Sequence, residues 1–571
     1  MLARGASADR RALLFSIFCK MALRLPRRVG SAKDASLYDL ATTLLFVALV
    51  ALVVTTFRDY AISNDEEVQQ HYGALIVSYY ASGFADQALF HFRDLYLYGG
   101  LFDIIAVGLQ HIVPLDTYDV RHLLCAFIGI GGIGATWATA RAIGGPRAGL
   151  LAVAGLAVCG IWYGAMFAHT KDIPFAVAMA GASYALLRLA RELPKPRWRW
   201  VLLFGVLTGC ALGIRILGVF AISYAGFAVA AHVPFRGDGW GKRLAVVTRA
   251  ALAFLPAFLV AYAIMIAAWP WASLAPLNPL RAISAFDDFH YPISTILGGH
   301  IYKMADVPRW YVPAYVGIKL TLLLLIGALL GLVHALLPDP TGAAAAVEPR
   351  RSKTWRKETA LIALAALFPL VCDVVAHAPG DTGMRHFLFV APPIAVLAGL
   401  GLDGTLQRLE QFSPRIAIAG LAVVLLSLVS DATTLYRLHP DEYLSYNSLV
   451  GGLEGASRRY ATDYWVNIMP EAVGDLELYL DQTDRSGAKR SEVHYSVAVC
   501  GERLPFEKKA DPRLQWTRDW SHADFFIAPT HMNCDRALDG RIVAKIERMG
   551  VLIGVVKDRR PRISANIAHN G

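Results

Sequence analysis

The sequence predicts an α-helical membrane protein with many transmembrane helices and a small C-terminal α/β domain. Of its 571 residues, 56% are hydrophobic and only 18% are charged, a composition too apolar for an ordinary soluble enzyme. A transmembrane helix needs about 20 mostly apolar residues, and about eleven runs of this kind precede residue 432. No such run follows it. The chain therefore divides into a membrane part and a C-terminal part that faces water.

The apolar runs define three expected parts of the chain. The runs are 39–57, 120–141, 147–166, 172–190, 199–214, 216–232, 250–269, 312–336, 359–377, 386–402 and 415–431. We expect a basic leader at 1–38, a transmembrane domain at 39–431 and a water-exposed domain at 432–571. Within the leader, the short apolar piece 12–19 is broken by a lysine, which favours an interfacial amphipathic segment over a cleaved signal peptide.

The basic residues indicate how the chain is oriented in the membrane. The formal net charge is +10, but Lys and Arg concentrate in alternate loops, such as 188–199, 236–249 and 350–357, so this excess does not indicate nucleic-acid binding. The positive-inside rule then puts the Arg-rich leader in the cytoplasm. With about eleven spans the C-terminal domain lies outside, which is the periplasm if the membrane is a bacterial inner membrane.

The C-terminal domain should combine a helix, short strands and a disulfide. The pattern predicts a helix at 470–481 and strands at 493–499, 525–528 and 542–556. Cys500 and Cys534 are the two cysteines of this outer domain, and an oxidising compartment commonly pairs them. Two free buried thiols are the alternative. The other five cysteines lie in or beside apolar segments, where they act as small hydrophobes.

An acidic group stands just beyond the first apolar run. Asp65, Glu66 and Glu67 are adjacent in a long outer loop that also holds a short apolar helix near 102–113. A solvated loop that only balances charge is the simpler explanation. If the acids begin a helix, Glu67 points about 100° away from Glu66, so we interpret Glu67 as a solvated charge. Asp65 is then the leading candidate base, and Glu66 is its helper.

Further polar clusters fall in short loops on the same predicted side. The second outer loop contains Lys171 and Asp172, the third contains Arg215, and a later one contains Arg385 followed by His386. Charged groups at the edge of a membrane are costly unless they are paired or face water. The structural alternatives are that the basic side chains extend to lipid headgroups and that Asp172 caps a helix. Arginine and lysine also bind phosphate groups.

Carboxylates beside fixed cations at a membrane surface suit the transfer of a group from a lipid phosphate. A carboxylate removes a proton from the acceptor, while the cations stabilise the departing phosphate. A sugar on a polyprenyl phosphate fits this arrangement because phosphate leaves as an anion and needs no proton. One base then suffices, so the sugar is transferred in a single displacement with inversion at the anomeric carbon.

Three motifs resemble the C-type (GT-C) glycosyltransferase superfamily. These motifs are Asp65-Glu66 in the first outer loop, 169–175 as the second outer loop, and Arg385-His386-Phe387 at the start of a late span. The resemblance covers most of 39–431 and is strongest to family 39, with the protein O-mannosyltransferases and the lipid A aminoarabinose transferases. It implies an inverting membrane glycosyltransferase that uses a polyprenyl-phosphate sugar.

The resemblance also implies roles for individual residues. Asp65, Glu66 and Asp172 would be catalytic, and Arg385 would meet the donor phosphate, with His386 standing where tyrosine is common. We assign Lys171 and Arg215 to the phosphate as well. The segment from His439-Pro440 to Asp463-Tyr464-Trp465 is similar to one in bacterial family members, but the sequence suggests no chemical role for it. It differs from the outer module of the protein mannosyltransferases, which argues against a protein acceptor.

The sequence leaves metal use and the competing functions open. Asp65, Glu66 and His71 carry ligand atoms for a divalent cation such as Mg²⁺ or Mn²⁺, although the basic side chains could supply the same charge. The expected partners are a polyprenyl-phosphate-linked sugar donor, membrane lipids and an acceptor that is a lipid, glycan or protein. The alternative function is a transporter or flippase of a lipid-linked or polar solute, which needs ionisable groups at the centre of the membrane.

Overall fold

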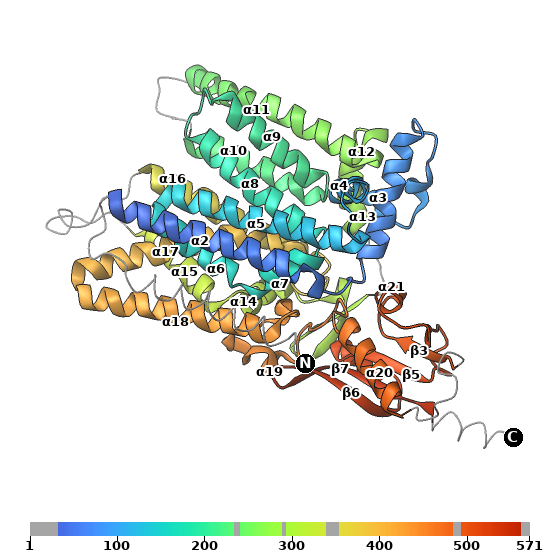
Figure 1. Ribbon diagram of the computed structural model, residues 1–571. Helices are drawn as coiled ribbons and strands as arrows, with labels where there is room; N and C mark the ends of the chain where they lie inside the picture. Colours follow the sequence, from blue (N-terminus) through green and yellow to red (C-terminus); the bar gives the residue numbers. More distant parts are fainter. Residues whose placement is uncertain (1–31, 233–239, 288–292, 338–352, 484–492, 561–571) are drawn as a thin grey trace.

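In the computed structural model, a bundle of long helices packs at one end against a small domain built on a five-stranded sheet (Figure 1). The structure describes residues 32–232, 240–287, 293–337, 353–483 and 493–560. The leader up to residue 31, the segment 233–239, and the first three residues of the basic loop 350–357 lie outside the described residues. The predicted fold class is confirmed: a mostly helical membrane protein with a small C-terminal sheet region.

Seven helices of the described chain are long and apolar enough to cross a membrane. They are α2 (Ala32–Thr56), α5 (Thr117–Gly144), α8 (Asp172–Ala190), α11 (Trp240–Ala268), α16 (Lys353–Ala376), α17 (Ala391–Phe412) with the preceding turn η7 (Arg385–Val390), and α18 (Pro414–Leu438). Two bent pairs raise the count to nine if each pair is one span. These pairs are α6 (Pro146–Ala157) with α7 (Gly160–Ala168), and α14 (Tyr311–Lys319) with α15 (Leu322–Leu336).

The number of full spans in the described chain is smaller than the expected count of about eleven. Every predicted run is helical, but 199–214 and 216–232 form the shorter helices α9 (Trp198–Leu212) and α10 (Phe220–His232). The run 312–336 bends by 111° because the backbone at Leu320 is extended and Thr321 caps a new helix. An apolar run records length and composition, but it does not record where the backbone changes direction.

Helix α17 forms the centre of the membrane part. In its apolar window 94% of the residues are buried, whereas the corresponding share for α18 is only 17%. Glycine permits the close packing: a Cβ atom on Gly401 would lie 2.0 Å from the Gly327 carbonyl oxygen of α15. Small residues commonly allow the backbones of membrane helices to approach in this way. Helix α17 is therefore surrounded by protein, while most of α18 faces outward.

The loops at one end of the bundle build a layer of short elements. Helices α3 (Glu66–Ala81), α4 (Leu101–Gln110), α12 (Pro270–Leu274) and α13 (Asn278–Asp287) gather there (Figure 1). The short apolar helix expected near 102–113 is confirmed as α4. A hairpin of β1 (Ser294–Leu297) and β2 (His300–Lys303) turns at two glycines with positive φ. The nearby 3-10 turns are η1 (Phe57–Asp59), η2 (Ala88–His91), η3 (Leu95–Leu97), η4 (Ile216–Val219) and η5 (Met304–Asp306).

The C-terminal region forms a mixed sheet with the strand order β4-β3-β5-β7-β6. The strands are β3 (Tyr495–Val499), β4 (Leu514–Trp516), β5 (Phe525–Pro529), β6 (Arg541–Arg548) and β7 (Val551–Asp558). The helices and turns are α19 (Gly452–Ala456), α20 (Met469–Thr483), α21 (Arg503–Glu507), η8 (Glu442–Leu444), η9 (Ser448–Val450) and η10 (His531–Arg536). The predicted helix and strands are present, but 542–556 is a hairpin, because Met549 and Gly550 adopt the positive φ of a turn.

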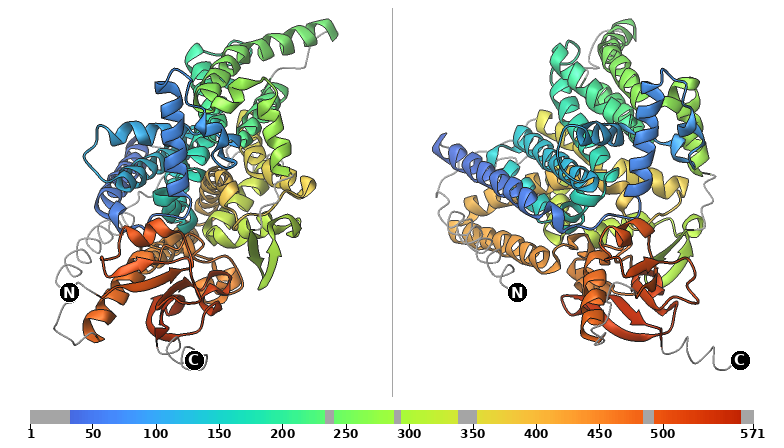
Figure 2. Two further views of the ribbon diagram at one scale, coloured as in Figure 1. Left: turned by 90° about the vertical axis from the view of Figure 1, so that its right-hand side faces the viewer. Right: turned by 45° about the vertical axis from the view of Figure 1, so that its right-hand side comes forward.

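A disulfide joins the two cysteines of this region. Cys500 and Cys534 lie with their Cα atoms 6.5 Å apart and are bonded to each other, as expected for an oxidising compartment. The sheet lies at the same end of the bundle as α3 and α21 (Figures 1 and 2). Helix α18 runs on to Leu438, beyond the expected boundary at 432. The segment that follows it lies against the helical part, so the two regions share a tight junction.

Candidate active site

Four polar groups that the sequence placed on one side of the membrane meet at this end of the bundle. Asp65 precedes α3, Asp172 begins α8, Arg215 follows α9, and Arg385 begins η7. Ion pairs connect them: Arg385 faces both carboxylates, and Arg215 contacts Asp172. Because each residue stands at an end of a helix, the packing of the helices brings the four side chains together.

Arg385 is the hub of this cluster. Its Nη2 donates to Asp65 Oδ2 over 3.1 Å, and its Nε lies 3.4 Å from Asp381 Oδ2 and 3.9 Å from Asp172 Oδ2. The Arg385 side chain is only 13% exposed. A planar guanidinium offers several donors at fixed angles, which suits it to carboxylates and phosphates alike. Arg385 is thus held by acidic groups in a position from which it could bind an anion.

The two candidate carboxylates differ in their access to solvent. The Asp65 side chain is 43% exposed, whereas that of Asp172 is 3% exposed. One Asp172 oxygen accepts a hydrogen bond from Arg215, and the other faces Arg385 and His169. Asp65 can therefore be reached by an incoming molecule, while Asp172 is enclosed by basic side chains.

Lys171 adds another cation beside this cluster. Its half-buried Nζ lies 4.1 Å from the centre of the Tyr98 ring, within the range of a cation–π interaction. Burial, together with repulsion from Arg215, lowers the pKa of Lys171 to about 8. A bound anion would oppose both effects, because it favours the charged form of the amine. Lys171 is therefore well placed to respond to a phosphate group.

Asp381 joins the site although the sequence gave it no role. It lies four residues before Arg385, in the same short loop, and His386 Nε2 is 3.4 Å from its Oδ2. Burial acts to raise the pKa of Asp381, but Arg385 and His386 outweigh it and hold the value below the usual range. The sequence signal that could have indicated this contact is the spacing of four residues between Asp381 and Arg385. His386 thus faces a carboxylate at the side of the site.

Glu66 is near Asp65 in sequence but points into the protein. Its side chain is fully buried, and its Oε2 accepts from the Ser63 backbone N–H over 2.8 Å. His122 Nε2 lies 3.1 Å from the same oxygen, and Arg121 Nε lies 3.9 Å from Oε1. This arrangement resembles a capping box, in which an acid in the first turn holds the start of its own helix. Glu66 lies behind Asp65, not at the surface.

A buried network behind the site was missed by sequence reasoning. Arg121 is fully buried and donates to Asp103 over 2.8 Å, to Thr170 over 3.1 Å and to Gln69 over 3.4 Å. Arg121 lies within the predicted span 120–141, and Asp103 lies within the predicted apolar helix 102–113. Neither segment was expected to contribute to a polar site. The network joins α3, α4, α5 and the loop that carries Lys171. It therefore holds together the elements that position the site.

The suggested metal ligands do not gather. Within the described parts of the chain, no three His, Cys, Asp or Glu side chains form a group that could hold a metal ion. Glu66 is buried against Arg121 and His122, whereas the ring of the exposed His71 lies 4.6 Å from that of Phe92. Asp65, Glu66 and His71 therefore do not come together as the sequence suggested, although all three lie at or near the start of α3.

The segment after α18 contributes one more side chain. The indole of Trp465 lies under the Arg385 guanidinium, whose Cζ is 4.6 Å from the ring centre. Trp465 is 5% exposed. The sequence drew attention to Asp463-Tyr464-Trp465 without assigning it a role, because no local pattern shows that this outer segment reaches the membrane part.

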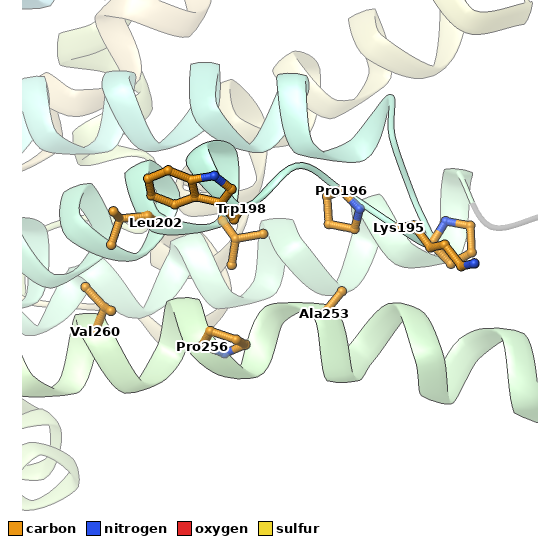
Figure 3. Close-up of a pocket in the computed structure, with 9 residues that line it drawn as sticks. Lys195, Pro196, Trp198, Leu202, Ala253, Pro256 and Val260 are labelled. Carbon is orange, nitrogen blue, oxygen red and sulfur yellow. The ribbon is translucent and has the colours of Figure 1, made fainter.

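An apolar crevice lies far from this cluster. It runs between α9 and α11 and is lined by Trp198, Leu202, Pro256 and Val260, with Lys195 at one end (Figure 3). Trp198 begins α9 and Arg215 follows its other end. At 1.5 Å per residue the two ends of α9 are about 21 Å apart. The crevice therefore belongs to the opposite end of the helices from the charged cluster.

Comparison with known proteins supports the resemblance over part of the chain. Residues 116–271 match a family model described as dolichyl-phosphate-mannose-protein mannosyltransferase. The matched segment includes Lys171, Asp172 and Arg215. No curated protein matches the chain.

Several solved structures match the chain at low sequence identity. ArnT from Cupriavidus metallidurans bound to undecaprenyl phosphate is 14% identical, with a TM-score of 0.46, over 90% of this chain and 97% of that chain. The archaeal oligosaccharyltransferase AglB from Archaeoglobus fulgidus is 12% identical, with a TM-score of 0.42, over 86% and 70%. The S. cerevisiae protein O-mannosyltransferase Pmt1-Pmt2 complex is 14% identical, with a TM-score of 0.31, over 48% and 40%.

The description of the matched family names a glycosyltransferase, and the matched residues include part of the charged cluster. The match over residues 116–271 thus confirms the resemblance to the C-type glycosyltransferases that the sequence predicts.

Proposed function

We propose that this protein transfers a sugar from a polyprenyl-phosphate donor to an acceptor, with inversion at the anomeric carbon. The observation that carries the proposal is the contact between Asp65 and Arg385, 3.1 Å apart, with Arg215 and Lys171 close by. A half-exposed carboxylate beside several cations provides a base and an anion site in one place. The description of the matched family also names a dolichyl-phosphate sugar as donor.

The proposed reaction is a single displacement. The acceptor hydroxyl attacks the anomeric carbon while Asp65 takes its proton. The bond between that carbon and the phosphate oxygen breaks, and its electron pair leaves on the phosphate. Arg385, Arg215 and Lys171 stabilise the charge that develops there. The step balances because the carboxylate gains the proton and the polyprenyl phosphate leaves as the anion.

The enclosed acids serve this step indirectly in our proposal. Asp172 contacts Arg215 and faces Arg385, so it fixes the direction of both guanidinium groups. Glu66 holds the first turn of α3 through the Ser63 N–H and so fixes the backbone that carries Asp65. His386 lies 3.4 Å from Asp381, beside the carboxylate that faces Arg385. Arranging the site before substrate binds lowers the cost of reorganisation during the reaction.

The location of the site follows from the same proposal. The N-terminus lies in the cytoplasm, and the charged cluster and the domain at 432–571 face the other side, the periplasm of a bacterial inner membrane. The division into 1–38, 39–431 and 432–571 agrees with this arrangement. The alternating basic loops support this orientation through the positive-inside rule. The sugar and the acceptor depend on the shape of the pocket around Asp65.

The test compares Asp65→Asn with Glu67→Gln in cells in which each variant replaces the unaltered protein. Membrane lipids, glycans and secreted proteins are analysed by mass spectrometry. Asp65→Asn should lose transfer by 10²- to 10⁴-fold, the usual contribution of a general base, and should accumulate a polyprenyl-phosphate sugar. Glu67→Gln, a change at the exposed neighbouring residue, should leave the products unchanged. Normal products with Asp65→Asn, in protein of normal amount, would overturn the proposal.

A further inference from the structure

The Asp463-Tyr464-Trp465 segment belongs to the region after α18, yet Trp465 lies inside the charged cluster. Its indole is 5% exposed and lies under Arg385, with 4.6 Å between the guanidinium carbon and the ring centre. The aromatic face attracts the cation and also limits its directions of movement. The same guanidinium contacts Asp65. One face of the indole therefore helps to fix the direction of the Arg385 guanidinium, which is proposed to bind the donor phosphate.

The edge of the same indole makes a second directed contact. Trp465 Nε1 donates to His169 Nε2 over 2.5 Å, and His169 is 2% exposed. Indole nitrogen can only donate, so His169 Nε2 must accept and carries no proton. The ring is then neutral with its proton on Nδ1, in agreement with a pKa that burial lowers to about 3. Nδ1 lies 3.9 Å from Asp172 Oδ2.

These contacts connect Trp465 to both arginines of the site. It contacts Arg385 directly. Its N–H also fixes His169, whose Nδ1 lies 3.9 Å from the Asp172 carboxylate, and Asp172 in turn binds Arg215. The histidine tautomer matters because the opposite tautomer would turn a lone pair towards the carboxylate. The side chain of a water-exposed domain thus orders two cations at the end of the membrane helices.

The segment is docked firmly enough to act in this way. A Cβ atom on Gly164 of α7 would lie 2.3 Å from the Tyr443 backbone nitrogen, so α7 and η8 touch directly. Asp463 accepts from the Tyr443 hydroxyl and from the backbone N–H of Asn467 over 2.8 Å. His169 immediately follows α7. The loop that carries Trp465 and the helix end that carries His169 are therefore fixed relative to each other.

We propose that Trp465 is a positioning residue for the donor-phosphate site, acting on Arg385 through its ring and on Asp172 through the N–H···His169 hydrogen bond. The inference rests on the proposed function, because it assumes that the arginines bind the phosphate of the donor. It adds that the C-terminal domain supplies part of that site. The domain is then required for donor binding itself, in addition to any part it plays with the acceptor.

The test uses full-length protein in detergent and undecaprenyl phosphate as the probe. Trp465→Phe keeps a ring under Arg385 and loses the N–H, whereas Trp465→Leu loses both. We expect Trp465→Leu to weaken binding about 5- to 30-fold, the range of a buried cation–π contact, and Trp465→Phe to weaken it less. The matched control is Trp516→Leu, because Trp516 also lies beside an arginine, Arg503, 5.3 Å from its ring, but on strand β4.

A double-mutant cycle separates positioning from a general loss of structure. If the indole acts through His169, adding His169→Phe to Trp465→Phe should weaken binding no further, so the two losses are not additive. Full additivity would overturn the relay through His169. Unchanged binding by folded Trp465→Leu would overturn the whole proposal. Failure of the unaltered protein to bind undecaprenyl phosphate would instead count against the proposed function. If Trp465→Leu does not fold, Trp465→Phe and the cycle decide.

Discussion

Arg385 donates a hydrogen bond of 3.1 Å to Asp65, a residue 320 positions earlier in the chain. The proposed base and a proposed phosphate ligand therefore neutralise each other in the free protein. A donor phosphate would compete for Arg385, and Asp65 would then be free to accept a proton. In this way, binding of the donor phosphate to Arg385 would release Asp65 to act as the base.

Replacement of Arg385 by lysine should impair transfer strongly. A single ammonium group cannot keep the contacts that the guanidinium makes with Asp65 and Asp381 while also facing a phosphate. We expect transfer to fall about 10²- to 10³-fold, as when one preorganised donor is removed. Steady-state kinetics with a polyprenyl-phosphate sugar would measure it. Arg58→Lys is the control, since Arg58 is 62% exposed and pairs with Asp119 at the surface; equal losses in both variants would argue against a special role for Arg385.

Replacement of Arg121 by methionine should destabilise the protein. It would leave Asp103 buried without its cation, and breaking a buried ion pair on one side costs about 3–5 kcal/mol. Thermal unfolding in detergent would measure the change. Arg58→Met removes an exposed pair and should cost no more than about 1 kcal/mol. Adding Asp103→Leu to Arg121→Met should restore part of the loss; if it deepens the loss, the unpaired carboxylate is not the cause.

Stability should fall in alkaline solution through His439. Its Nδ1 lies 2.8 Å from Glu442 and its Nε2 lies 2.9 Å from Asp59. Burial opposes the charge, but these carboxylates outweigh it and raise the pKa of His439 to about 9. Since the folded value exceeds an unfolded value of about 6.5, the stabilisation is complete below about pH 6.5 and is lost as the pH rises through about 9.

Melting temperatures between about pH 6 and 10 would check this dependence. His439→Gln should be less stable than the unaltered protein near pH 6 and should approach it near pH 10. His494→Gln changes an exposed histidine and serves as the control. Parallel curves for the unaltered protein and His439→Gln would contradict the prediction.

The disulfide should stabilise the C-terminal sheet. Cys500 and Cys534 are 34 residues apart, and closing a loop of this length restricts the unfolded chain by about 4 kcal/mol. We expect the paired change to serine to lower the unfolding temperature of this domain. A reducing agent should produce the same decrease in the unaltered protein and none in the double variant. A decrease of equal size in both would mean that the agent acts elsewhere.

The sequence was sufficient to predict the helices of the membrane part and most elements of the C-terminal domain. Lipid leaves no water to satisfy backbone groups, so each span must be helical and apolar for about 20 residues, and that requirement is written locally in runs such as 172–190. The bends at 158–159 and 320–321 were not predicted, because neither interrupts the apolar composition of its run. The same composition fits a straight helix and a broken one.

The sequence also identified four charged residues at the edge of the membrane as candidates for a functional site, because such charges are costly unless they are paired or face water. They are Asp65, Asp172, Arg215 and Arg385. What it could not decide is which of them touch. The neighbours Asp65 and Glu66 have opposite surroundings, 43% and 0% exposed, because one helical step of about 100° turns one outward and the other inward. Likewise, Trp465 lies under Arg385 only because α7 and the segment after α18 pack together. Chemical type is a property of each residue, whereas contact between distant residues is a property of how whole helices pack.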